Sequence, residues 1–159
     1  MKQITAQSLA QLSQQAQQSP RLRANLNFHP QLDDTIQRLA IAMEPQTYVR
    51  PHRHPHTWEL LTALHGSFIV LLFDDQGKVT HRSLLGKETA ILEIPANVWH
   101  AVLSLDVGAV IFEVKHGPYP PVNAEDLASW SPAEGEGEAD VSNILAWYGV
   151  ASIGENYLR

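Results

Sequence analysis

Short β-rich runs fill the middle of the chain and leave little room for anything but strands. They begin near Thr35 and read IQRLAIAM, TYVR, WELLTAL, SFIVLLF, KVTHRSLL, TAILEI, HAVLSL and AVIFEVK. Their close spacing allows no crossover helices, so the strands should pair antiparallel. Glycine stands in the connections at Gly66, Gly77, Gly86 and Gly108, as tight hairpins require. The pattern predicts an all-β sandwich or jelly-roll barrel.

The segments that flank the β-rich region differ from it in residue pattern and composition. Apolar residues at Leu9, Leu12 and Ala16 predict an amphipathic helix that ends before Ser19-Pro20. The next stretch, RLRANLNFHP, has the Asn, Arg and Pro content of an irregular loop. Beyond Lys115, the stretches GPYPP and SPAEGEGEAD predict a linker, and VSNILAWY predicts a short helix that packs on the barrel. We therefore divide the chain into a helix and arm (1–30), a barrel (31–118) and a C-terminal extension (119–159).

Composition limits the chemistry of the chain. It has no cysteine, so any transition metal must be held by imidazole and carboxylate groups. No apolar run is long enough to span a bilayer and the N-terminus lacks a signal-peptide pattern, which predicts a cytoplasmic protein. The net charge of -6 argues against nucleic acid as a partner. Basic residues nevertheless outnumber acidic ones from Met1 to Arg53, either to meet an anionic small molecule or as solvated surface.

A histidine-rich stretch, Pro51 to Thr57, precedes the WELLTAL run. Alternate side chains of an extended strand share a face, so His52 and His54 should point the same way. Glu59 follows on the apolar run, where a buried carboxylate would be costly unless it were paired or bound to a cation. Some forty residues later the proline-anchored turn EIPANVWH delivers His100. In a small barrel the two segments can meet, which predicts a metal site of three histidines and one glutamate.

These residues resemble the two sequence motifs of the cupin superfamily, a group of jelly-roll β-barrels. His52, His54, Glu59 and Gly66 fit the spacing of the first motif, while Pro95, Asn97 and His100 fit that of the second. Asn97 replaces the usual turn glycine, and asparagine tolerates the left-handed conformation better than most residues. Longer segments, among them TYVRPHRHPHTWE, IFEVKHGPYPP and SWSPAEGE, are similar to the WbuC family of cupin-fold metalloproteins. That resemblance implies a link to surface-polysaccharide gene clusters.

Several other side chains are candidates for the site. The alternation that turns His52 inward should turn Arg50, and with it Tyr48, toward the barrel mouth, where Arg50 would bind a substrate carboxylate or phosphate. A salt bridge from Arg50 to Glu93 or Glu113 is the competing interpretation. Glu113 and Tyr119 are candidate acid or base groups, although no catalytic residue can be assigned. The polar segment with Arg21, Arg23, Asn25 and Asn27 either folds over the barrel opening or contacts another subunit. The remaining histidines are expected at the surface: His29, His56, His65, His81 and His116.

Two classes of function fit this set of residues. One is a metal-dependent isomerase, epimerase or dioxygenase acting on a small polar or anionic metabolite such as a sugar derivative. The other is a metal-dependent binding or regulatory module without turnover. The ligands accept Fe, Mn, Co, Ni, Cu or Zn and do not choose among them. Cupin barrels commonly pair, so the expected assembly is a homodimer.

Overall fold

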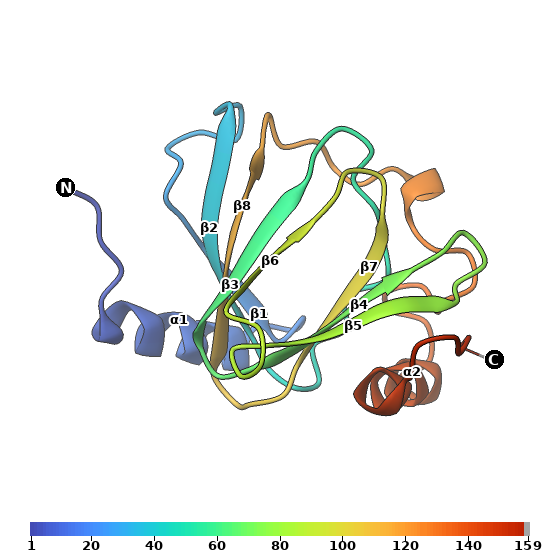
Figure 1. Cartoon of the computed structure of the whole chain (residues 1–159). Helices are drawn as coiled ribbons and strands as arrows, with labels where there is room; N and C mark the ends of the chain where they lie inside the picture. Colours follow the sequence, from blue (N-terminus) through green and yellow to red (C-terminus); the bar gives the residue numbers. More distant parts are fainter. Residues whose placement is uncertain (158–159) are drawn as a thin grey trace.

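The computed structural model describes residues 1–157 as two antiparallel sheets with a helix on each outer side (Figure 1). The helical elements are α1 (Ala6–Gln18), the single-turn η1 (Ala124–Asp126) and α2 (Glu138–Val150). The strands are β1 (Arg23–Asn27), β2 (Ile36–Met43), β3 (Glu59–His65), β4 (Phe68–Phe73), β5 (Val79–Leu85), β6 (Ile91–Ile94), β7 (Trp99–Ser104) and β8 (Ala109–His116). The sheet orders are β1-β2-β8-β3-β6 and β5-β4-β7. This confirms the predicted jelly-roll architecture.

Three apolar layers hold the two sheets and the helices together. The inner layer lies between the sheets and includes Leu61, Phe68 and Ile111. A second layer packs Ile144 and Tyr148 of α2 against the outer side of the three-stranded sheet. This packing explains why the run FIVLLF shows no alternation, because β4 is buried on both faces. No helix within residues 1–157 is long and apolar enough to cross a membrane.

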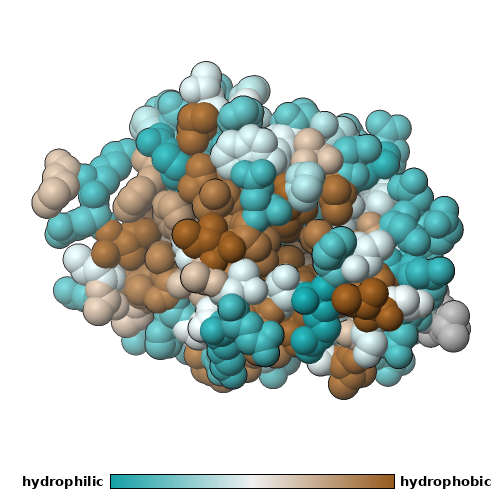
Figure 2. Space-filling model, in the orientation of Figure 1, coloured by the Kyte–Doolittle hydropathy of each residue, from teal (hydrophilic) through white to brown (hydrophobic). Residues whose placement is uncertain are grey.

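Helix α1 covers the outer side of the five-stranded sheet, where Leu12 and Ala16 pack on Ala40, Ala42 and Val110. Its N-terminus is stabilised by a capping box, in which Thr5 and Ser8 each accept a hydrogen bond from the other's backbone N–H. Beside α1, apolar side chains gather over the middle of the face shown in Figure 2.

The homodimer expected from the fold remains a prediction.

The segment after α1 corrects the sequence analysis. The predicted irregular loop contains strand β1, which pairs antiparallel with β2 from Arg23 opposite Met43 to Asn27 opposite Leu39. Its alternate residues Ala24 and Leu26 pack in the layer under α1. The other face of β1 is polar, so the strand carries little of the apolar periodicity by which strands are recognised.

The predicted strand TYVR is also wrong. Residues 47–50 belong to no strand, and the chain beyond them pairs with the C-terminal extension instead. Arg53 donates its backbone N–H to the carbonyl of Asp126, and Ala128 donates to the carbonyl of Pro51. The chain just after TYVR, at residues 51–53, therefore bonds to a distant partner that no local pattern reveals.

Candidate metal centre

Backbone hydrogen bonds bring the two histidine segments together. His52 and His100 form an isolated antiparallel bridge, in which each donates its N–H to the other's carbonyl, at 3.1 and 2.9 Å. The N–H of Asn97 donates to the carbonyl of His54 at 2.9 Å. Asn97 has φ of 66°, so this turn uses the left-handed conformation that asparagine tolerates. The meeting of the two motifs is thus built into the main chain.

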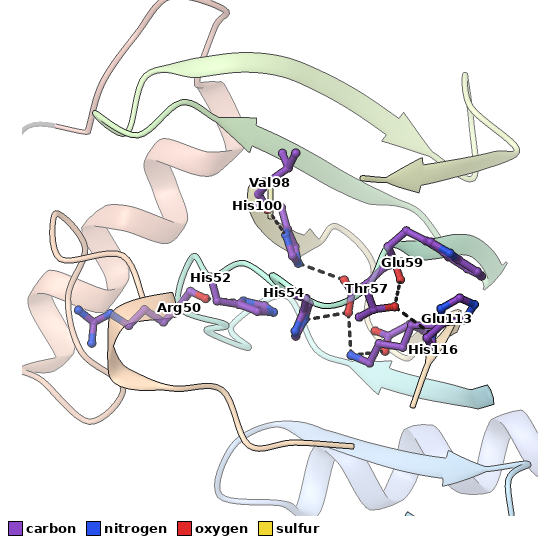
Figure 3. Close-up of polar contacts among 11 residues, drawn as sticks. Arg50, His52, His54, Thr57, Glu59, Val98, His100, Glu113 and His116 are labelled. Atoms are coloured by element: carbon purple, nitrogen blue, oxygen red, sulfur yellow. Dashed lines mark hydrogen bonds and ion pairs between the residues drawn. The ribbon is translucent and has the colours of Figure 1, made fainter. Parts of the chain in front are cut away.

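Three imidazoles converge at this bridge. One ligand nitrogen from each of His52, His54 and His100 lies within 4.8 Å of the others. The Nδ1 atoms of His52 and His100 each lie 2.9 Å from a backbone carbonyl, that of Arg50 and of Val98 (Figure 3). A neutral ring that donates from Nδ1 keeps its lone pair on Nε2. The backbone therefore selects the tautomer in which Nε2 can bind a metal.

The buried nitrogens of the cluster fit a cation. The Nε2 atoms of His54 and His100 are inaccessible to solvent and have no hydrogen-bond partner. Such atoms are costly to bury unless something satisfies them, and metal coordination would do so.

Glu59 lies against two of the three rings. Its Oε1 is 2.9 Å from Nε2 of His54, and its Oε2 is 3.1 Å from Nε2 of His100. Both contacts have ion-pair distance, although neither ring nitrogen makes a well-aligned hydrogen bond. Burial would raise the pKa of Glu59, but His100, His54 and Lys115 together hold it well below its usual range. Glu59 is thus an ionised carboxylate beside the group of His52, His54 and His100, and its role as a fourth metal ligand remains a prediction.

The cation beside Glu59 is Lys115. Its ammonium group lies 2.7 Å from Oε1 of Glu59 and 2.8 Å from Oε1 of Glu113. Despite burial, the charges of Glu113 and Glu59 raise the pKa of Lys115. Burial and then the charge of Glu59 raise the pKa of Glu113. Glu113 and Lys115 therefore form an ion pair that lines the cavity inside the barrel.

The pKa values of two clustered histidines shift in opposite directions in the metal-free protein. Burial, and then the charge of His100, lower the pKa of His52 to about 3. Burial also opposes protonation of His100, but the contact with Glu59 outweighs it and raises the pKa of that ring. Protons therefore compete with a metal more strongly at His100 than at His52.

The cluster opens into a cavity of about 790 Å³ inside the barrel. Its walls include apolar residues such as Leu39, Ile41 and Val102. Polar residues line it too, among them Glu113, Lys115 and Tyr119. The volume suits a small metabolite.

The predicted substrate residues are placed differently from one another. Arg50 lines the cavity, but its guanidinium group points away from the histidine rings in Figure 3. It donates to the carbonyl of Ala128 at 2.6 Å from Nη2, and from Nε to Oγ of Ser131 at 3.2 Å. The Tyr48 hydroxyl donates to the carbonyl of Pro132 at 2.8 Å. Both side chains therefore form hydrogen bonds to the C-terminal extension. Substrate binding by Arg50 and Tyr48 remains a prediction.

Two inward-facing residues were not recognised from the sequence. His29, expected at the surface, is buried, lines the cavity, and accepts a hydrogen bond from the N–H of Arg38 at 3.0 Å. No local pattern indicates that His29 is buried, because its ring is held by a hydrogen bond to Arg38 in the distant strand β2. Lys115, which also lines the cavity, is the second such residue. Its position two residues after Glu113 on one strand was a usable signal, since such residues share a face.

The paired sheets and the motif spacing of the clustered residues define the protein as a cupin-type jelly roll. Solved structures share this fold: the TT1209 protein from Thermus thermophilus aligns with a TM-score of 0.55 and 18% identity over 73% of this chain and 97% of that chain. Oxalate oxidase in complex with glycolate gives 0.51 and 18%, over 66% of this chain and 56% of that one. Pumpkin pro-11S globulin gives 0.52 and 21%, over 66% and 28%. At such identities the likeness concerns the fold alone.

The sequence itself places the chain in a family. It belongs to the family described as "Domain of unknown function (DUF6016)", whose model matches residues 4–85. That range includes α1, β1 and the first histidine motif. No curated protein sequence matches the chain. The resemblance to the WbuC family is not confirmed by these matches.

Proposed function

We propose that the protein binds one divalent transition metal through His52, His54 and His100, with Glu59 as the fourth ligand. The observation that carries this proposal is the convergence of three imidazole nitrogens within 4.8 Å of one another beside an ionised carboxylate. Three imidazoles and a carboxylate suit Fe, Mn, Co, Ni, Cu or Zn, so the donor set leaves the identity of the metal open.

The bound ion would act on a small polar or anionic metabolite in the barrel cavity. When bound, such a metal supplies Lewis-acid chemistry or dioxygen chemistry, which suits an isomerase, an epimerase or a dioxygenase. In the chain itself, backbone carbonyls fix the tautomers of His52 and His100, and apolar and polar side chains together line the cavity. A sugar derivative of surface-polysaccharide metabolism is the substrate that the WbuC resemblance supports.

A binding or regulatory module is the second candidate, and one observation favours it. Catalysis of proton transfer needs an acid or base beside the metal. Glu59 and Glu113, the carboxylates at the cluster, are both engaged by Lys115. Incubating the metal-loaded protein with candidate sugar nucleotides and following the mixture by NMR and by mass spectrometry separates the two candidates. New NMR signals at unchanged mass support an isomerase or epimerase, a new mass supports a dioxygenase, and tight binding without either change supports the module.

The metal site itself is tested by metal analysis of protein purified without a nickel column. The wild type should carry about one equivalent of transition metal, and His52→Ala and His100→Ala should each lose it while remaining folded by circular dichroism. His65→Ala is the control, because His65 is exposed at the end of β3. Full occupancy in both site variants would refute the assignment.

A further inference from the structure

Two arginines hold one carboxylate at the wall of the cavity. Arg21 and Arg23 both contact Glu134, with Nη2 of Arg21 on Oε2 and Nη2 of Arg23 3.4 Å from Oε1. All three residues line the same cavity as the three histidines. Two guanidinium groups converging on the two oxygens of a carboxylate form an arrangement that suits any carboxylate or phosphate group.

The inner face of β1 continues this polar wall. Asn25 and Asn27 line the cavity on the same face as Arg23, and both are exposed. Across the sheet, β1 is separated from β3, which carries Glu59, by β2 and β8. Three inter-strand steps correspond to roughly 14 Å along the sheet, and barrel curvature shortens the direct path. A metabolite can therefore reach both the metal ligands and this wall.

The ion pairs that Glu134 forms with Arg21 and Arg23 are weak. The Arg21 and Glu134 side chains keep 60% and 39% of their exposure, whereas Arg23 keeps 18%. Ion pairs with such exposure are screened by water and contribute little. Glu134 precedes Gly135 and Gly137, where an added Cβ would meet nothing within 4 Å. The carboxylate thus stands on a segment with open space around it, so it can leave the arginines without disrupting packed structure.

We propose that Arg21 and Arg23 form an anion subsite for the cavity's ligand, and that Glu134 occupies this subsite in the ligand-free protein. The ligand class that fits is a small metabolite with a carboxylate or phosphate at one end and a metal-binding oxygen at the other. Apolar wall residues such as Ile41, Met43 and Ile111 lie along the cavity between the two ends. The metal-binding half of this description rests on the proposed function, but the anion subsite does not.

The test uses metal-free full-length protein, so failure of the metal site does not affect it. Inorganic phosphate and acetate are titrated separately while NMR follows the Nε–Hε signals of Arg21 and Arg23. Both anions should shift these two signals together, and the tighter one identifies the preferred group. Glu134→Gln removes the internal competitor and should tighten binding about two- to fivefold, the factor that corresponds to an exposed ion pair.

Two matched controls separate the subsite from general charge effects. Glu138→Gln removes the same charge four residues further on, outside the cavity lining, and should leave the affinity unchanged. Arg21→Gln should weaken binding at least threefold, whereas Lys87→Gln, at an exposed turn, should not. Unshifted arginine signals, or equal tightening by Glu134→Gln and Glu138→Gln, would overturn the proposal.

Discussion

Lys115 offers the sharpest test of the electrostatics inside the barrel. The side chains of Lys115, Glu59 and Glu113 are only 13%, 5% and 12% exposed, and one ammonium group lies within 2.8 Å of both carboxylates. Replacing Lys115 by methionine keeps most of its aliphatic stem but leaves two acids in one buried place. Removing one partner of a buried ion pair typically costs about 3–5 kcal/mol. We therefore expect Lys115→Met to destabilise the metal-free protein by about that much.

The measurement is urea unfolding at pH 7, supported by thermal denaturation of metal-free protein. For a chain of this size each kcal/mol lowers Tm by about 2–4 °C, so Lys115→Met should lose roughly 6–20 °C. Arg21→Gln breaks a mostly exposed pair and should cost no more than about 1 kcal/mol. Adding Glu113→Gln to Lys115→Met should recover part of the loss, because one buried charge is then removed. A loss below about 1 kcal/mol for Lys115→Met would refute the reasoning.

Two further predictions concern protonation and a tight turn. In the metal-free protein His52 has a pKa of about 3, against 6.5 for a free ring. Between these two pH values the unfolded chain binds a proton at His52 and the folded protein does not. The stability that the neutral His52 ring contributes is therefore lost as the pH falls from 6.5 toward 3. Nitrogen NMR at pH 5 should show a neutral His52 ring beside a charged His100; a charged His52 ring would contradict this. Gly66 has φ of 69°, and an added Cβ would lie 2.8 Å from Cβ of Ala109, so Gly66→Ala should cost roughly 2–4 kcal/mol in urea unfolding. Gly135→Ala, with positive φ but open space, should cost about 1 kcal/mol, and equal costs at both glycines would disprove the packing argument.

Local signals predicted the barrel strands because each run had its own apolar pattern and its own turn. The run SFIVLLF became β4, and the turn glycine that precedes it, Gly66, has the positive φ that the turn requires. The clustering of His52, His54 and His100 was predictable as well, since motif spacing together with a closed barrel leaves those rings few other places. These features depend on short-range periodicity and on a fold with few alternatives.

What sequence reasoning missed depends on contacts between distant segments. The sequence predicts a loop at β1 because the side chains that face the cavity are polar, and only pairing with β2 reveals the strand. The stretch TYVR predicts a strand, although the chain after it pairs with residues 126–128. Nothing next to His29 in the chain indicates that its ring is buried. In each case the partner that decides the structure lies elsewhere in the chain, beyond the reach of any local window.

The histidine cluster and one wall of the cavity come from separate segments of the chain, which affects how this protein can evolve. The histidines that meet at the backbone bridge all lie between residues 52 and 100, whereas one cavity wall is contributed by a five-residue strand at the sheet edge. Substitutions at Arg23, Asn25 or Asn27 alter that wall without touching the hydrogen bonds that orient the rings. Selection, natural or in the laboratory, can therefore change this wall of the cavity through one strand while the cluster of three histidines stays intact.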